Sequence, residues 1–190
     1  TAGILLQKSH AHIRNSTFAD NGTAVNVENQ AVATITGNLI SFSGQHEASK
    51  CSAIKISCAS AKVSENKITG CGTGIFVKAG KGVTVNSNTV AKATGAAVLV
   101  HAPWSKDLCV SGNDLYGNHW GIVCRSVPAR HEGAHEKAKL DISANKISGS
   151  ASSAILVSGG GFGGWLAIRV CGNTLTCNYA GLTISGPSLR

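Results

Sequence analysis

The sequence predicts an all-β solenoid of about eight coils, and three observations support this fold class. A four-residue apolar segment recurs eight times, as GILL 3–6, AVNV 24–27, AIKI 53–56, GIFV 74–77, AVLV 97–100, GIVC 121–124, AILV 154–157 and GLTI 181–184. Their first residues lie 21, 29, 21, 23, 24, 33 and 27 positions apart, which is a solenoid period interrupted by variable insertions. An asparagine also recurs at one fixed place in nearly every repeat unit, and no helical periodicity accompanies it.

Each of these four-residue segments closes a repeat unit, and its second and fourth residues are always apolar. Alternation with period two is typical of a strand with one buried face. A single coil cannot bury that face, but coils stacked about 4.8 Å apart bury it against one another. We therefore expect the second and fourth residues of every closing segment to face inward and the third residue to face outward.

The recurring polar position lies two residues before an apolar residue in each unit, and we interpret it as a structural ladder. Asparagine tolerates the left-handed backbone of a tight corner, and its amide can bond to the equivalent amide in the coils above and below. These properties favour a structural role over a ligand-binding one. The ladder is expected at Ser16, Asn38, Asn66, Asn88, Asn113, Asn145 and Asn173.

Composition is consistent with one domain spanning residues 1–190, because 43% of the residues are apolar and no composition shift marks a boundary. No run of 18 apolar residues is present, so no membrane-spanning helix is expected. The chain contains no methionine and no evident cap for either end of a solenoid. An uncapped end exposes strand edges, so we expect this domain to be part of a longer chain or an assembly.

The seven cysteines are odd in number and lack the spacing of a disulfide framework. This favours an intracellular, reducing compartment, cytoplasmic or cytoskeletal, with import into an organelle left open. The net charge of +8 allows an acidic partner, although the lysines do not gather in one repeat column. The sequence contains no nucleic-acid-binding motif.

The unit running through Asn66, Ile68 and the closing segment at 74–77 resembles the repeat of the right-handed parallel β-helix superfamily, which includes pectate lyases and polygalacturonases. The resemblance covers nearly the whole chain and implies a right-handed, single-stranded parallel β-helix with about three short sheets. In repeat style the chain is most similar to the non-catalytic β-helix domains of F-box and Shc-binding proteins. The F-box members imply one further role, substrate recognition in a ubiquitin ligase.

The carboxylates do not form the clusters that carbohydrate chemistry on such a scaffold requires. Hydrolysis needs paired acids, and calcium-dependent elimination needs several carboxylates beside a base. No two of the nine are adjacent and no repeat column collects them, so we expect no catalytic residues, no metal site and no cofactor. They are Asp20, Glu28, Glu47, Glu65, Asp107, Asp114, Glu132, Glu136 and Asp141.

The third residues of the closing segments provide the clearest candidate for an interaction surface. From the fourth to the seventh unit they are all apolar although they should point outward, and contiguous exposed apolar residues usually mark an interface. Alternatively, aromatic insertions fold back over this strip. The interface candidates are Leu5, Phe76, Leu99, Val123 and Leu156, together with Trp104, Phe162 and Trp165 of the insertions.

We therefore expect a non-catalytic scaffold that presents a rigid surface to other proteins within a large complex. The alternative is a carbohydrate-binding or polysaccharide-modifying β-helix of the lyase or hydrolase type. Glycan binding or calcium-dependent lyase activity would favour that alternative, as would a pair of acids on one face of the folded chain.

Overall fold

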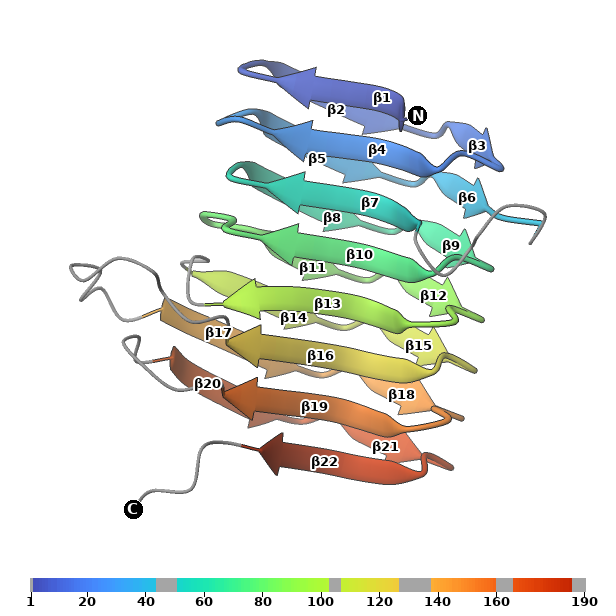
Figure 1. The fold of residues 1–190 in the computed structure, drawn as a ribbon, viewed down its shortest axis with the longest axis vertical. Coiled ribbons are helices and arrows are strands. Elements are labelled where there is room, and N and C mark those ends of the chain that lie inside the picture. The colour runs from blue at the N-terminus through green and yellow to red at the C-terminus, as the bar shows by residue number, and fades with distance from the viewer. Residues whose placement is uncertain (1, 44–50, 103–106, 127–137, 160–165, 186–190) are drawn as a thin grey trace.

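The computed structural model describes residues 2–43, 51–102, 107–126, 138–159 and 166–185. Within these ranges the 22 regular elements are all strands, and they pair in parallel to form three sheets. Figure 1 shows the strands stacked as one continuous coil, with β1 at one end and β22 at the other. The predicted all-β solenoid is therefore confirmed, with seven complete three-strand turns and an eighth turn opened by β22.

Sheet A contains the eight closing segments, hydrogen-bonded in the order in which they occur in the chain. The alternating apolar residues of each segment make it a strand, because one face can then be buried. We number the turns one to eight by their sheet A strand. These strands are β1 (Ala2–Gln7), β4 (Thr23–Glu28), β7 (Ser52–Ser57), β10 (Thr73–Lys78), β13 (Ala96–Ala102), β16 (Trp120–Ser126), β19 (Ser153–Gly159) and β22 (Ala180–Ser185).

Sheets B and C carry the remainder of each turn, and a tight corner at the asparagine position separates them. Sheet B comprises β2 (His10–Arg14), β5 (Val32–Thr36), β8 (Ser60–Ser64), β11 (Thr84–Asn86), β14 (Leu108–Ser111), β17 (Ala138–Ser143) and β20 (Leu166–Cys171). Sheet C comprises β3 (Thr17–Ala19), β6 (Leu39–Ser41), β9 (Lys67–Thr69), β12 (Thr89–Ala91), β15 (Asp114–Tyr116), β18 (Lys146–Ser148) and β21 (Thr174–Thr176).

The core is a narrow column of small apolar side chains enclosed by the three sheets. Ile54, Ile75 and Ile122 on sheet A are fully buried, as are their counterparts on sheets B and C in the middle turns. Burial decreases at the two ends, because the described residues stack no further turn on β1 or β22. Leu182 and Ile184 of β22 are 47% and 73% exposed although they occupy inward-facing positions.

The asparagine ladder is present and continuous from turn two to turn seven. The side-chain nitrogen of each asparagine donates to Oδ1 of the next one, at 2.9 to 3.0 Å, in the steps Asn38 to Asn66, Asn88, Asn113, Asn145 and Asn173. The same nitrogen also donates to a sheet B carbonyl one turn back, as from Asn88 to Val63 at 3.0 Å. Ser16 begins the ladder with its backbone N–H, which donates to Asn38 Oδ1.

The predicted backbone conformation of the ladder is corrected by the structure. The left-handed residue of the corner is the one before each ladder position, as at Glu65 and Ser87 with φ of 59° and 54°. Those side chains are exposed, whereas Asn66 and Asn88 are buried. The corner therefore places its strained residue where the side chain can point to solvent, and the asparagine takes the inward position where its amide bonds.

Two cysteines are built into the core as small apolar side chains. Cys71 and Cys124 are fully buried, whereas Cys58 and Cys177 are exposed. Burial raises the pKa of the Cys71 and Cys124 thiols to about 12, because a thiolate is poorly solvated there.

Cys58 and Cys177 are expected to react quickly with a disulfide reagent at neutral pH, while Cys71 and Cys124 stay unreacted until the chain unfolds. The reason is that only an accessible thiolate attacks the reagent. Counting modified sites by mass spectrometry during native labelling measures this directly. A C58S/C177S variant serves as the control and should lose the fast phase. Rapid modification of Cys71 in the folded protein would contradict the described packing.

Candidate functional site on the outer face of sheet A

Outward positions on sheet A form straight columns, because the parallel strands pair without a slip in register. The third residues pair in succession from Leu5 to Asn26, Lys55, Phe76, Leu99, Val123, Leu156 and Thr183. We call this the third column. The four apolar residues that the sequence singled out in turns four to seven are direct neighbours. Leu5 lies apart from them, because Asn26 and Lys55 stand between.

The apolar members of the third column differ in exposure. Leu5 is 51% exposed, whereas Phe76, Leu99 and Leu156 are partly buried. Val123 is only 1% exposed although it lies outside the central hydrophobic cluster. It is paired in register between Leu99 and Leu156, so larger side chains flank it on both sides.

Trp104, Phe162 and Trp165 lie outside the described residues, and so do most residues of the insertions that contain them. Whether these aromatic side chains cover the third column stays a prediction. The interface and the intramolecular cover therefore both remain open for this strip.

A second outward column runs beside the first and is basic in its middle. The fifth residues, one position after each closing segment, pair as Gln7, Glu28, Ser57, Lys78, His101, Arg125, Ser158 and Ser185. We call this the fifth column. The expectation that lysines do not line up holds for lysines alone. When His101 and Arg125 are counted together with Lys78, a basic column appears in turns four to six. The search of the sequence for aligned lysines missed it.

The two columns are in contact through an aromatic pair. The rings of Phe76 and His101 meet edge to face, with centroids 4.9 Å apart and an interplanar angle of 82°. The pKa of His101 is lowered, first because the ring is partly buried and then because Arg125 and Lys78 repel its charged form. The neutral form of His101 is therefore favoured at pH 7.

Acidic side chains are nearly absent from these two columns in the described residues. Glu28 in turn two is their one carboxylate, and the amides of Gln7 and Asn26 donate to it. From turn three onward the third and fifth columns contain Lys55, Lys78 and Arg125 but no carboxylate. The middle of this face therefore combines apolar and cationic side chains.

The remaining candidate ligands are dispersed. Within the described ranges no group of three or more His, Cys, Asp or Glu side chains is placed to hold a metal ion. His10 and His12 are exposed on β2, and His119 packs edge to face on Trp120 with ring centroids 4.1 Å apart. Glu47, His131, Glu132, His135 and Glu136 lie outside the described residues.

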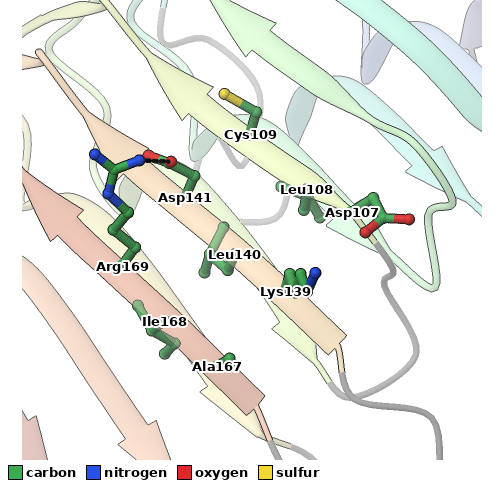
Figure 2. A pocket seen from close by; sticks show the side chains of 9 residues that line it. All are labelled: Asp107, Leu108, Cys109, Lys139, Leu140, Asp141, Ala167, Ile168 and Arg169. Atoms are coloured by element: carbon green, nitrogen blue, oxygen red, sulfur yellow. Dashed lines mark hydrogen bonds and ion pairs between the residues drawn. The ribbon is translucent and has the colours of Figure 1, made fainter.

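A hollow of about 410 Å³ lies at sheet B, where β14, β17 and β20 run side by side. Leu108, Leu140, Ile168 and Ala167 give it apolar walls, and Asp107, Lys139, Asp141 and Arg169 add charges. Figure 2 shows Arg169 reaching across to Asp141 on the neighbouring strand, where Nη1 and Oδ2 are 3.3 Å apart. The other oxygen, Asp141 Oδ1, is buried and has no hydrogen-bond partner among the described residues. Sequence reasoning missed this hollow because its residues come from three units with long insertions between them.

Comparison with known proteins agrees with this architecture. Residues 2–178 match the family described as the right-handed beta helix region. The chain belongs to this family. No curated protein and no solved structure gave a significant match. The predicted resemblance to the right-handed parallel β-helix superfamily and the predicted fold class are thus confirmed for nearly the whole length of the chain. The fold alone does not assign an activity, because β-helices act both as enzymes and as scaffolds. No helix among the described residues is long and apolar enough to cross a membrane.

Proposed function

We propose that this β-helix is a non-catalytic scaffold that presents the outer face of sheet A to protein partners. The observation that carries the proposal is the in-register run of Phe76, Leu99, Val123 and Leu156 at outward positions. Phe76, Leu99 and Leu156 of this run remain partly exposed, and removing apolar surface from water on association is favourable.

The rigidity of this face also supports the scaffold role. Each sheet A strand in the middle of the stack bonds to a strand on both sides, and the ladder ties the same turns together at their corners. A rigid surface loses little conformational entropy when a partner binds. This favours a role in which the chain positions other proteins.

Replacing Leu99 with Lys and Leu156 with Thr is expected to release the protein from its assembly without unfolding it. The same column already carries Lys55 and Thr183, so both substitutions copy residues that sheet A accommodates. Val123 is left unchanged because its 1% exposure would make a charge there destabilising. Sedimentation of a native cell extract, with detection by antibody, measures the size of the particle.

Leu39→Lys is the matched control, because Leu39 is 43% exposed on β6 of sheet C, away from the proposed face. We expect the wild type and this control to sediment in a large particle, and the sheet A variant to sediment at the size of the free chain. Thermal unfolding followed by circular dichroism checks that all three proteins are folded. A wild-type protein that sediments alone would overturn the scaffold proposal.

A carbohydrate-active site is the second candidate, and the hollow at sheet B is the observation that favours it. Asp107 and Asp141 both line that hollow, so it holds two of the chain's carboxylates. Incubation with polygalacturonate or alginate, with and without Ca²⁺, tests for cleavage by the release of new chain ends. Activity that Asp141→Asn abolishes would support this candidate. Failure of the wild type to cleave or bind any glycan would remove it.

A further inference from the structure

We propose that the partner segment docked on sheet A is an acidic protein segment whose carboxylates pair with Lys78 and Arg125 while its apolar side chains cover Phe76 and Leu99. The inference rests on the proposed scaffold function and specifies the class of its partner. It concerns turns four to six, where the basic part of the fifth column lies beside the apolar part of the third column.

The register places the two kinds of side chain in adjacent rows. Phe76 pairs with Leu99 and Lys78 pairs with His101 between β10 and β13. Leu99 pairs with Val123 and His101 pairs with Arg125 between β13 and β16. Neighbouring strands lie about 4.8 Å apart, so the Cα atoms of Lys78 and Arg125 are about 10 Å from each other, with β13 and His101 between them.

Charge complementarity selects the sign of the partner. Lys78 and Arg125 are exposed, and in turns three to eight no carboxylate occupies either column to neutralise them. A basic segment would be repelled here, whereas an acidic one would be attracted and fixed in register. The guanidinium of Arg125 can bind a carboxylate with two parallel hydrogen bonds, which adds directional preference.

The apolar row selects the class of partner among polyanions. A nucleic acid or an acidic glycan would satisfy Lys78 and Arg125 but would leave Phe76 and Leu99 against polar groups. A polypeptide carries carboxylates and aliphatic side chains on the same short segment, so it matches both rows. We therefore favour a protein segment, and the other polyanions become outcomes of the test.

The test uses a fluorescein-labelled peptide in which Glu alternates with Leu, titrated with the full chain and followed by fluorescence anisotropy. The Lys78→Gln/Arg125→Gln variant is expected to bind it roughly tenfold more weakly, since two solvent-exposed ion pairs are lost. The Lys62→Gln/Lys67→Gln variant is the matched control. Both of its lysines are exposed, on β8 and β9, and the change in net charge is the same.

Three results would overturn the proposal. The first is an equal loss of binding in both double variants, which would indicate attraction by net charge alone. The second is equal binding of a peptide with Gln in place of Glu. The third is displacement of the peptide by polygalacturonate or an RNA homopolymer that binds more tightly, because the face would then recognise a polyanion of another class. Circular dichroism confirms that each variant is folded before it is titrated.

His101 supplies a second readout that is independent of affinity. The charged groups facing it in the described residues are Lys78 on β10 and Arg125 on β16, and both disfavour its protonation. A bound carboxylate would favour the protonated ring, so the pKa of His101 measured by NMR should rise when the peptide is added. An unchanged pKa under saturating peptide would place the peptide elsewhere.

The outcome separates this inference from the scaffold proposal. Suppose that the wild type sediments in a large particle, that L99K/L156T is released from it and that K78Q/R125Q is not. This result would support the scaffold proposal and overturn the proposal of an acidic partner. Release of K78Q/R125Q from the same particle, with K62Q/K67Q still bound, would support both.

Discussion

Asn88→Ser is expected to lower the free energy of unfolding by about 3 kcal/mol, since several buried polar groups lose their partners together. Asn88 Nδ2 donates to Val63 O, Asn86 O and Asn113 Oδ1. Its Oδ1 accepts from both the backbone and the side-chain nitrogen of Asn66. A serine here can still donate to Asn86 O, as Ser16 does to Arg14 O at 3.0 Å, but it is too short to reach Val63 O, Asn113 Oδ1 and the nitrogens of Asn66. Asn88 is only 1% exposed, so water cannot readily replace the lost bonds.

The matched control is Asn86→Ser on the same turn. The side chain of Asn86 makes one long bond of 3.4 Å to Ser87, and within the described ranges its Oδ1 has no partner. The register-equivalent residues on the neighbouring strands are Ser64 and Ser111, so serine fits the site. We expect a loss below about 1 kcal/mol there. Urea unfolding monitored by circular dichroism compares the two, and equal losses would show that the ladder adds no stability beyond that of an ordinary polar residue.

Ile56→Ala is expected to cost about 2 to 5 kcal/mol, because it removes a fully buried side chain and leaves a cavity. Ile56 is 0% exposed, and in register it lies between Val27 and Val77. Since the neighbouring strands are held in register by the hydrogen bonds of sheet A, they cannot easily move in to fill the space.

Ile184→Ala makes the same chemical change in the same inward column, at the end of the stack. Ile184 is 73% exposed, because in the described part of the chain β22 has a neighbouring strand, β19, on one side only. We expect a loss of roughly 1 kcal/mol or less, since little apolar surface leaves water when this side chain packs. Thermal and urea unfolding of the two variants provide the comparison. Similar losses of unfolding free energy in the two variants would contradict the expectation that an inward side chain stabilises the fold more when it is buried between two turns.

The sequence was sufficient to predict the fold because nearly every repeat unit has the same pattern of apolar residues and the same asparagine position. Inward positions such as Ile75 and Ile122 alternate with outward ones, and each ladder asparagine lies two residues before an apolar residue. The left-handed residue was misplaced by one position. Asparagine at a corner suggested positive φ, but the exposed residue before it, such as Glu65, adopts that conformation.

The candidate face was only partly predictable. Alternation placed Phe76, Leu99, Val123 and Leu156 outward, but it could not indicate that Val123 is 1% exposed between its neighbours. The basic part of the fifth column was missed because Lys78, His101 and Arg125 are different residue types that follow the apolar segments. The signal that would have revealed it is that each of three successive closing segments is followed directly by a basic residue. The hollow at sheet B depends on residues brought together across insertions, which spacing alone does not specify.

The ladder also gives the stack a polarity. Every step runs the same way, from the N–H groups of one asparagine to the oxygen of the next, as from Asn66 to Asn88 and from Asn88 to Asn113. The two faces of any middle turn are therefore chemically different. Toward the preceding turn the asparagine side chain presents Oδ1 and an N–H that bonds to a sheet B carbonyl, whereas toward the following turn it presents an N–H alone. Turns could be duplicated, deleted or exchanged between proteins of this family only in the same orientation, as head-to-tail modules. An inverted turn would set donor against donor at the corner.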